Sequence, residues 1–275
     1  MSFYTSLSGL KAAQTDLGAI SNNLANVGAT GFKKSRAQFG DLFASSPTQS
    51  TKMIAGQGVR LNGVVQQFTQ GTLEASEKTL DLAIAGEGFF VVKGAAPRED
   101  VTYTRNGAFS VNANREVVDT IGSKLQLLPV DADGNVTSTA LSEAADLILP
   151  SNSPSDPNSS LANVSIGIDG LVTATYSDGT SQKLGKIAMA SFTAVEGLRP
   201  VGDAHWQSTG DSGQPQINSA NNGPLGTIRS GALERANVDV TEELVALISA
   251  QRNFQANAKA IETAKSMTQS IMNIN

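Results

Sequence analysis

Only a few residues of this chain have a type and spacing that could support catalysis. His205 is the single histidine, and a catalytic triad would also need a nearby nucleophile and an acid that orients the ring. No serine lies in the Gly-x-Ser-x-Gly pattern of a nucleophile elbow, and the chain contains no cysteine. We therefore expect His205 to be a loop or packing residue beside Trp206, and the protein not to be an enzyme.

Two other segments partly resemble binding motifs. The segment Asp131–Asn135 resembles the start of a calcium loop, but its glycine is the fourth residue instead of the sixth, and the twelfth is Ser142 instead of glutamate. The segment Gly56–Gly58 lacks the third glycine of a dinucleotide-binding fingerprint. Thiolate metal sites and disulfides require cysteine. The sequence thus predicts no catalytic residue, no cofactor and no metal site.

The composition restricts the class of protein further. The chain has 275 residues, 40% of them hydrophobic, which suits one large folded domain or two to three small ones. The net charge is −5 and the one basic cluster, Lys33–Arg36, is short, so we expect no nucleic acid partner. No stretch reaches ~18 consecutive apolar residues, so we expect no membrane insertion. The segment Met1–Ser6 lacks the features of a cleavable signal peptide.

The elements that would position functional residues begin with a helix over residues 3–27. Two sets of apolar residues recur there every seven positions: Phe3, Leu10, Leu17 and Leu24, and Ala13, Ile20 and Val27. This spacing places the side chains in one stripe along an α-helix. Gly28 and Gly31 follow as stop signals.

A second helix is expected from about Asp239 to about Met272. Its apolar residues also recur every seven positions, at Val240, Leu247, Phe254 and Ile261, with Leu244 and Ala258 four residues after the first and third of these. Asp239 can cap the helix, and Glu242 stands where a reciprocal capping partner would. The two ends of the chain therefore carry matching apolar stripes.

Each stripe needs a partner, which is either the rest of this chain or another copy of it. The stripes could be ordinary core, but the polar faces of both helices are rich in small and amide residues, which suits packing in more than one direction. We expect intersubunit packing at Phe3, Leu10, Leu17, Ile20, Leu24, Val27, Val240, Leu244, Leu247, Phe254 and Ile261.

The residues between the helices have the pattern of antiparallel strands. Leu80, Leu82 and Ile84 alternate with other residues, and Asn106-Gly107 predicts a two-residue hairpin turn with both residues at positive φ. The expected fold class is α+β, with terminal α-helices pairing into a coiled-coil-like tube domain and a central all-β antiparallel domain. The expected domains are 1–27 with 238–275, helical; 28–57, a connector; and 58–237, a β-rich outer domain.

Several segments together resemble a known family. They are Ser8–Leu10, Ile20–Asn26, Thr30–Lys33, Gln67–Gly71, Leu80–Ile84, Gly88–Phe90, Tyr103–Gly107, Val238–Leu244, Gln251–Arg252 and Phe254. This combination closely resembles the bacterial flagellar rod and hook proteins. The residues that carry the family signature are Ser21, Asn22, Asn23, Asn26, Gly31 and Phe32.

Within the family, the segments Ser35–Phe43 and Leu247–Asn257 resemble hook proteins more than distal-rod proteins. Many hook proteins have a further outer β-domain, for which this chain has no room, and distal-rod proteins usually have a longer polar insertion at residues 44–57. The hook is therefore the preferred assignment and the straight distal rod the alternative. A monomeric β-domain that binds a glycan or peptide is a further alternative.

The resemblance implies a structural subunit that self-polymerises into the curved tube joining the rod to the filament. It implies export through the flagellum by the type III apparatus without a cleavable signal peptide, and a location in the extracellular hook. The implied partners are many copies of the same chain, the neighbouring axial proteins (distal rod, hook cap and hook–filament junction) and the export apparatus.

Overall fold

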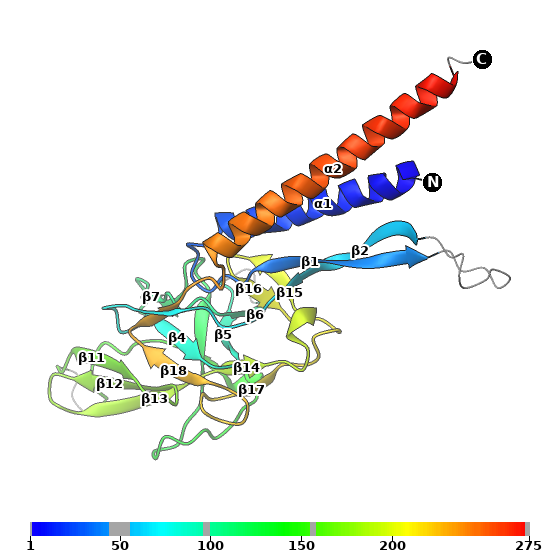
Figure 1. Ribbon diagram of the computed structural model, residues 1–275. Coiled ribbons are helices and arrows are strands. Elements are labelled where there is room, and N and C mark those ends of the chain that lie inside the picture. The colour runs from blue at the N-terminus through cyan, green and yellow to red at the C-terminus, as the bar shows by residue number, and fades with distance from the viewer. Residues whose placement is uncertain (1, 44–55, 96–99, 155–157, 273–275) are drawn as a thin grey trace. The chain divides into compact units, whose positions relative to one another are not determined.

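The computed structural model describes residues 2–43, 56–95, 100–154 and 158–272. The described residues form two long α-helices and an antiparallel β-structure, which confirms the α+β class (Figure 1). The chain divides into two compact units. The helical unit contains residues 1–27, 33–67 and 238–275, and the β unit contains residues 28–32 and 68–237. None of the described helices is both long and apolar enough to cross a membrane.

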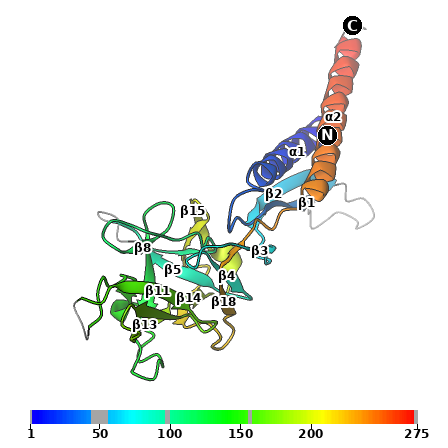
Figure 2. The ribbon, with the colours of Figure 1, turned by 90° about the vertical axis from the view of Figure 1, so that its left-hand side faces the viewer.

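Helices α1 (Ser2–Ala25) and α2 (Val240–Met272) pack against each other within the one chain (Figures 1 and 2). They run antiparallel, because Asn23 near the end of α1 hydrogen-bonds Glu243 near the start of α2, whereas Gly9 lies against Asn257. A Cβ atom added at Gly9 would lie 2.8 Å from the Asn257 side-chain oxygen, so a glycine allows the close approach. The coiled-coil tube itself stays a prediction.

The expected helix boundaries agree with the structure to within two residues. Asp239 caps α2, since its Oδ1 accepts hydrogen bonds from the backbone N–H of Thr241 (2.8 Å) and Glu242 (3.2 Å). The Glu242 carboxylate lies 3.5 Å from Lys34 Nζ. At the end of α1, the Asn26 side chain donates to the carbonyl of Asn22 at 2.9 Å. The bonds made by Asp239 and Asn26 satisfy backbone N–H and carbonyl groups that have no partner within the helix.

Residues 33–67 belong to the helical unit, so the structure draws the domain boundaries differently from the expected connector at 28–57. Strands β1 (Ser35–Phe43) and β2 (Gly56–Gln66) form a two-stranded antiparallel sheet, with Ser35 opposite Gln66 and Asp41 opposite Val59. Apolar and polar residues alternate only weakly along these two strands. Apolar side chains on both strands, such as Phe39 and Val64, are exposed. Residues 44–55, where distal-rod proteins usually have a longer polar insertion, lie outside the described residues.

The described residues of the β unit form one thirteen-stranded sheet and two strand pairs. The sheet strands are β5 (Phe89–Lys93), β6 (Val101–Thr104), β7 (Ser110–Val111), β8 (Val117–Val118), β9 (Lys124–Leu128), β10 (Ala145–Asp146), β11 (Leu161–Ile166), β12 (Leu171–Tyr176), β13 (Ser181–Ile187), β14 (Met189–Ser191), β15 (Arg199–Gly202), β16 (His205–Gln207) and β17 (Gln216–Asn218). The pairs are β4 (Leu82–Ala85) with β18 (Thr227–Ser230), and β3 (Leu73–Ala75) with β19 (Ala232–Glu234). The longest path follows the order β11-β12-β13-β9-β5-β6-β16-β15.

Two apolar clusters form the core of the β unit. One gathers around Phe90, Leu125 and Ile187, all fully buried. The other is aromatic, with the Trp206 ring centroid 5.4 Å from that of Phe68 and 5.7 Å from that of Phe89. Aromatic rings at such edge-on distances contribute more than their buried area alone.

The turn predicted at Asn106-Gly107 is wrong, although later Asp-Gly turns form. Neither Asn106 nor Gly107 has a positive φ, and β6 pairs with β5 and β16 instead of with the strand that follows it. Gly170 and Gly179 do have positive φ, between β11 and β12 and between β12 and β13. At Asn106-Gly107 the packing of distant segments therefore overrides local turn propensity.

Candidate assembly site

The structure separates the eleven predicted packing residues into covered and exposed sets. Ile20 is buried, and seven are half-buried: Leu10, Leu17, Leu24, Val27, Leu247, Phe254 and Ile261. Phe3, Val240 and Leu244 are 43%, 42% and 43% exposed. The packing of α1, α2 and the β1–β2 sheet within one chain accounts for the covered set. The exposed set is what remains for contact with another molecule.

Two further apolar residues of α2, which were not among the predicted packing residues, are also exposed. Val245 is 61% exposed and Ile248 is 49% exposed. Val240, Leu244 and Ile248 follow one another at four-residue spacing, so they lie along one face of the helix. Val240 and Leu244 were among the predicted packing residues, whereas Val245 and Ile248 lie outside the seven-residue repeat. We call Val240, Leu244, Val245 and Ile248 the α2 patch.

The signature residue Asn23 joins three elements of the helical unit. It is 2% exposed. Its side-chain oxygen accepts the Ser35 N–H at 2.8 Å, and its amide nitrogen donates to the Ser35 carbonyl at 2.9 Å and to Glu243 Oε2 at 3.2 Å. An amide is suited to this position because it is both donor and acceptor. Asn23 thereby fastens the first residue of β1 and the first turn of α2 to α1.

The other signature residues have different positions. Ser21 and Asn22 are exposed, and Asn26 and Phe32 are half-buried. Gly31 has φ +69°, and an added Cβ atom would lie 2.5 Å from the backbone nitrogen of Asn106. Gly31 is therefore required by both its conformation and its close packing.

Asn23 also borders a groove of about 580 Å³ in the helical unit. Acidic and basic side chains line it, among them Asp16 of α1, Lys34 and Arg36 beside or in β1, and Glu242 of α2. Burial raises the pKa of the Asp16 carboxyl above its ordinary value, and the charge of Arg36 partly opposes that rise. The lining is mixed in charge, and Lys34 pairs with Glu242, so the groove lies between packed elements of the helical unit.

Replacing Asn23 with alanine is expected to lower the free energy of unfolding of the helical unit by about 2–3 kcal/mol. The reason is that the buried carboxylate of Glu243 and the backbone of Ser35 lose hydrogen bonds that water cannot replace. Urea unfolding followed by far-UV circular dichroism measures the loss. Asn22→Ala, at an exposed neighbouring position, is the control and should stay within about 0.5 kcal/mol of the unmodified chain. Equal losses for both variants would contradict the role given to Asn23.

A hydroxyl group fixes the β1–β2 sheet to the other half of α1. The backbone N–H of Val59 donates to Ser8 Oγ at 3.2 Å, and that hydroxyl donates to the Thr5 carbonyl at 2.8 Å. Gly58 has φ +111°, and an added Cβ atom would lie 2.3 Å from Ser8 Oγ. Ser8 belongs to another segment of the family resemblance, so two such segments attach α1 to this sheet.

In the β unit, three further segments of the resemblance converge on Glu234, which is fully buried. Its carboxylate accepts the Gly71 N–H at 2.8 Å and lies 3.2 Å from the guanidinium of Arg105. Its carbonyl accepts the Gly31 N–H at 2.8 Å. Arg105 is 4% exposed, donates to the Gly86 carbonyl at 2.9 Å and stacks over the Phe89 ring at 5.4 Å. No motif or spacing in the sequence singled out Glu234.

His205 is a packing residue, with one partner that the sequence reasoning missed. It is 1% exposed, and its Nε2 lies 2.8 Å from the buried Asp119 carboxylate. Its Nδ1 lies 2.8 Å from the Asp203 carbonyl oxygen. Asp119 also accepts the backbone N–H groups of Ile121 and Ser123, so the pair connects β16 to the turn after β8.

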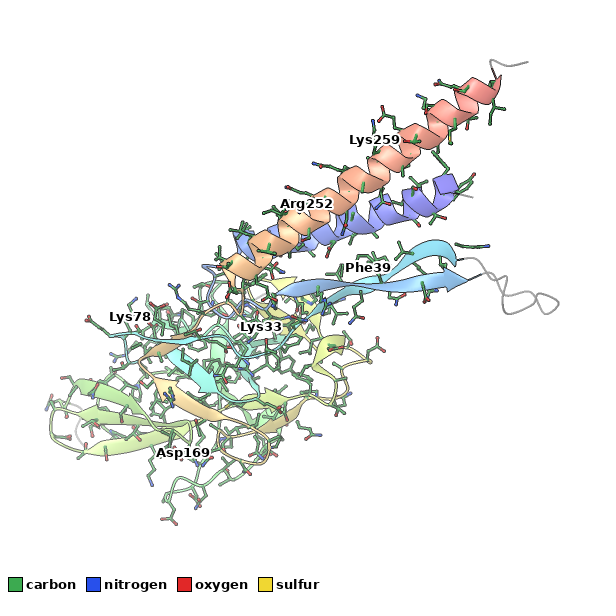
Figure 3. All side chains as sticks on the ribbon, viewed as in Figure 1. Lys33, Phe39, Lys78, Asp169, Arg252 and Lys259 are labelled. Carbon is green, nitrogen blue, oxygen red and sulfur yellow. The ribbon has the colours of Figure 1, made fainter. Side chains whose placement is uncertain are left out.

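The described residues of these sites make structural contacts, which are hydrogen bonds, ion pairs and apolar packing. Among the described residues, no three His, Cys, Asp or Glu side chains gather as a metal site would require. The calcium-like segment forms a turn, in which Asp131 accepts the Asn135 N–H at 2.7 Å. Exposed side chains of the helical unit include Arg252 and Lys259 on α2 and Phe39 on β1 (Figure 3).

These features define a class of protein in which both chain ends build one helical unit, with exposed apolar faces, and the middle folds into a β unit. Three family models match the chain. "Flagella basal body rod protein" matches residues 3–33. "Flagellar hook protein FlgE/F/G D1 domain" matches residues 83–174, and "Flagellar basal body rod FlgEFG protein C-terminal" matches residues 229–274.

Curated relatives extend the match to the full chain. The flagellar basal-body rod protein FlgG of Buchnera aphidicola is 33% identical over 276 residues, covering 96% of this chain and 95% of the relative. FlgG of Agrobacterium fabrum is 32% identical, covering 94% and 93%. The flagellar hook protein FlgE of Escherichia coli is 27% identical over 410 residues, with both chains fully covered. The chain belongs to the flagellar rod and hook protein family, a family of structural proteins.

Solved structures are similar as well, and a hook protein is among them. The Helicobacter pylori flagellar hook protein FlgE2 aligns with 56% of this chain and 43% of its own length, at 15% sequence identity and a TM-score of 0.25. That TM-score is too low to bear on the fold or the function.

Proposed function

We propose that this chain is a subunit of the flagellar hook, which polymerises with copies of itself through its helical unit. The observation that carries this proposal is the helical unit built from both chain ends, with apolar side chains exposed at the start of α1 and along α2. Burying one Val, Leu, Ile or Phe side chain contributes roughly 1.5–3 kcal/mol, so a few per subunit can drive association. In the tube, the helical units form the inner wall and the β units supply the outer contacts.

The choice of hook over rod is supported by the hook-like segments Ser35–Phe43 and Leu247–Asn257. The first of these is strand β1, and the residues that connect β1 to β2, 44–55, are fewer than distal-rod proteins usually have there. As a hook subunit, the chain would contact the distal rod, the hook cap and the hook–filament junction proteins. It would pass through the type III export apparatus to an extracellular location.

The distal rod is the second candidate, and a specific observation favours it. The alignment with the FlgG of Buchnera aphidicola spans 276 residues, almost the length of this chain. The alignment with the FlgE of Escherichia coli spans 410 residues and so contains long gaps opposite these 275. A straight drive shaft and a curved joint would both use the helical unit for assembly.

Electron microscopy of the polymer tests the proposal. The purified full chain is concentrated under assembly conditions, sedimented and imaged. Curved tubes, together with rescue of a strain that lacks its hook protein, are the expected result. Straight tubes, with rescue of a strain that lacks its distal-rod protein, would overturn the hook assignment in favour of the rod. A chain that stays monomeric at every concentration would overturn both assignments and favour a β-domain binding module.

A further inference from the structure

Three asparagines of this chain are followed directly by glycine, at Asn62-Gly63, Asn106-Gly107 and Asn222-Gly223. In such a pair the backbone nitrogen of the glycine can attack the side-chain amide carbon of the asparagine, because glycine has no Cβ atom to hinder the approach. The attack requires the backbone of the pair to rotate, so a folded chain permits it only where the pair can move without the rest of the fold. The environment of each pair therefore decides whether it reacts.

The pair Asn106-Gly107 is buried and bonded. Asn106 is 8% exposed, its backbone N–H donates to Thr104 Oγ1 at 3.0 Å, and its side-chain oxygen accepts the Ala108 N–H at 3.1 Å. The Gly107 carbonyl accepts the Leu82 N–H at 2.9 Å. Rotation of this pair breaks those bonds, so the surrounding β unit must open before the glycine nitrogen can reach the amide carbon.

The pair Asn62-Gly63 is exposed at Asn62 but lies inside strand β2. Gly63 is opposite Gln38 of β1, and Leu61 is opposite Phe39, so Asn62 is the extra residue of a bulge between two paired positions. Pairing on both sides fixes the backbone, because a rotation at the bulge would separate the two strands. This pair therefore holds an intermediate position among the three.

The pair Asn222-Gly223 lies in the turn that joins β17 to β18, and both residues are exposed. Gly223 has φ +62°, and nothing lies within 4 Å of its Cβ position. The turn is closed by the Asn221 N–H, which donates to the Gly226 carbonyl at 2.9 Å. Among the described residues, no hydrogen bond engages the Gly223 N–H, so the attacking nitrogen is already free.

The side chain of Asn222 is tied by one exposed hydrogen bond, in which its amide nitrogen donates to Asn218 Oδ1 at 3.0 Å. Water competes for an exposed bond of this kind, so the bond holds the amide weakly. The amide nitrogen is also the group that must leave in the reaction. Asn222 thus combines a free attacking nitrogen, a mobile exposed turn and an accessible leaving group.

We propose that Asn222 is a site of spontaneous deamidation, with water as the only co-reactant. A bond forms between the Gly223 nitrogen and Asn222 Cγ, and the bond from Cγ to Nδ2 breaks. The Gly223 nitrogen loses its proton, ammonia leaves, and a five-membered succinimide remains. Water then opens this ring at either carbonyl, which yields aspartate or isoaspartate at position 222. No electrons are transferred, and the chain gains one negative charge above the acidic range of pH.

The products change contacts that the β unit uses. Asn218 Oδ1, which accepts the amide of Asn222, also accepts the Ser219 N–H at 2.9 Å, so its orientation is fixed. A carboxylate at position 222 faces this oxygen with no proton to donate. Isoaspartate also lengthens the backbone of a turn that places Leu225, 5% exposed, in the core. The modified β unit should therefore be less stable than the fresh one.

Peptide mapping of the full chain tests the proposal. The folded protein is kept in mildly alkaline buffer and then digested with trypsin, which separates the three pairs because Lys78 and Lys186 lie between them. Mass spectrometry should show deamidation at Asn222 at least about tenfold faster than at Asn106, with Asn62 between them. The chain unfolded in urea is the reference, and there the three rates should converge. A folded chain whose Asn106 or Asn62 reacts as fast as Asn222, or whose Asn222 stays intact, would overturn the proposal.

The Asn222→Gln variant is the matched control, because it keeps the amide but would need a larger ring to cyclise. The aged unmodified chain should contain both isoaspartate and aspartate at position 222, and its midpoint of urea unfolding should fall with time. The aged variant should show neither change. Aspartate without isoaspartate would mean direct hydrolysis and would overturn the cyclic route. An equal fall of the midpoint in both proteins would overturn the stated effect on the β unit. None of these measurements requires the chain to polymerise, so they are independent of the proposed function.

Discussion

Replacing Arg105 with leucine is expected to lower the free energy of unfolding of the β unit by about 3–5 kcal/mol. The substitution leaves the Glu234 carboxylate fully buried without the cation that lies 3.2 Å from it. The loss of the bond to the Gly86 carbonyl and of the contact with the Phe89 ring adds to the cost. Chemical unfolding followed by Trp206 fluorescence measures the effect, since Trp206 is buried in the same unit.

Arg235→Leu is the matched control for this prediction. Arg235 pairs with Glu74, but the two side chains are 60% and 58% exposed. Water screens this pair, so the control should cost at most about 1 kcal/mol. The double variant Arg105→Leu/Glu234→Leu removes both buried charges and should recover part of the stability lost by Arg105→Leu alone. A single Arg105→Leu variant no less stable than the control would contradict the role given to the buried pair.

Replacing Gly107 with alanine is expected to destabilise the β unit by at least about 3 kcal/mol. An added Cβ atom would lie 1.7 Å from the carbonyl oxygen of Leu82, so the backbone of one segment must move. That movement would break the hydrogen bond from the Leu82 N–H to the Gly107 carbonyl, which is 2.9 Å long. Because Gly107 does not have a positive φ, the expected cost is steric and not conformational.

Gly210→Ala provides the control for this second prediction. Nothing lies within 4 Å of the Cβ position at Gly210, and its φ is not in the positive range. An alanine there should change the free energy of unfolding by no more than about 0.5 kcal/mol, and restricting the unfolded chain favours a small gain. The measurement is the midpoint of chemical unfolding for both variants under one set of conditions. A Gly107→Ala protein as stable as Gly210→Ala would show that the approach to Leu82 is looser than described.

The sequence was a good guide to the elements whose signals are local. The apolar repeats predicted both helices, and Asp239 predicted the start of α2, because a helix depends on spacing and on a cap within a few residues. The same kind of signal failed at Asn106-Gly107, where contact with Leu82, a residue distant in sequence, decides the backbone. It also failed for β1, which was expected to be part of a connector and instead pairs with β2 along its length.

By itself, the sequence determined the α+β class, the positions of the two helices and the family, since repeats and signature segments are properties of the chain order. The tertiary structure decided which partner each face has. An apolar stripe in the sequence shows that a helix face will be covered, but it does not show which element covers it. Here α1 and α2 of the same chain cover most of each other's stripes, in the register set by the contacts of Asn23 and Gly9. Only that register shows that Lys265–Met272 and the α2 patch are left exposed, because exposure depends on the relative lengths and offset of two helices whose residues lie more than two hundred positions apart in the sequence.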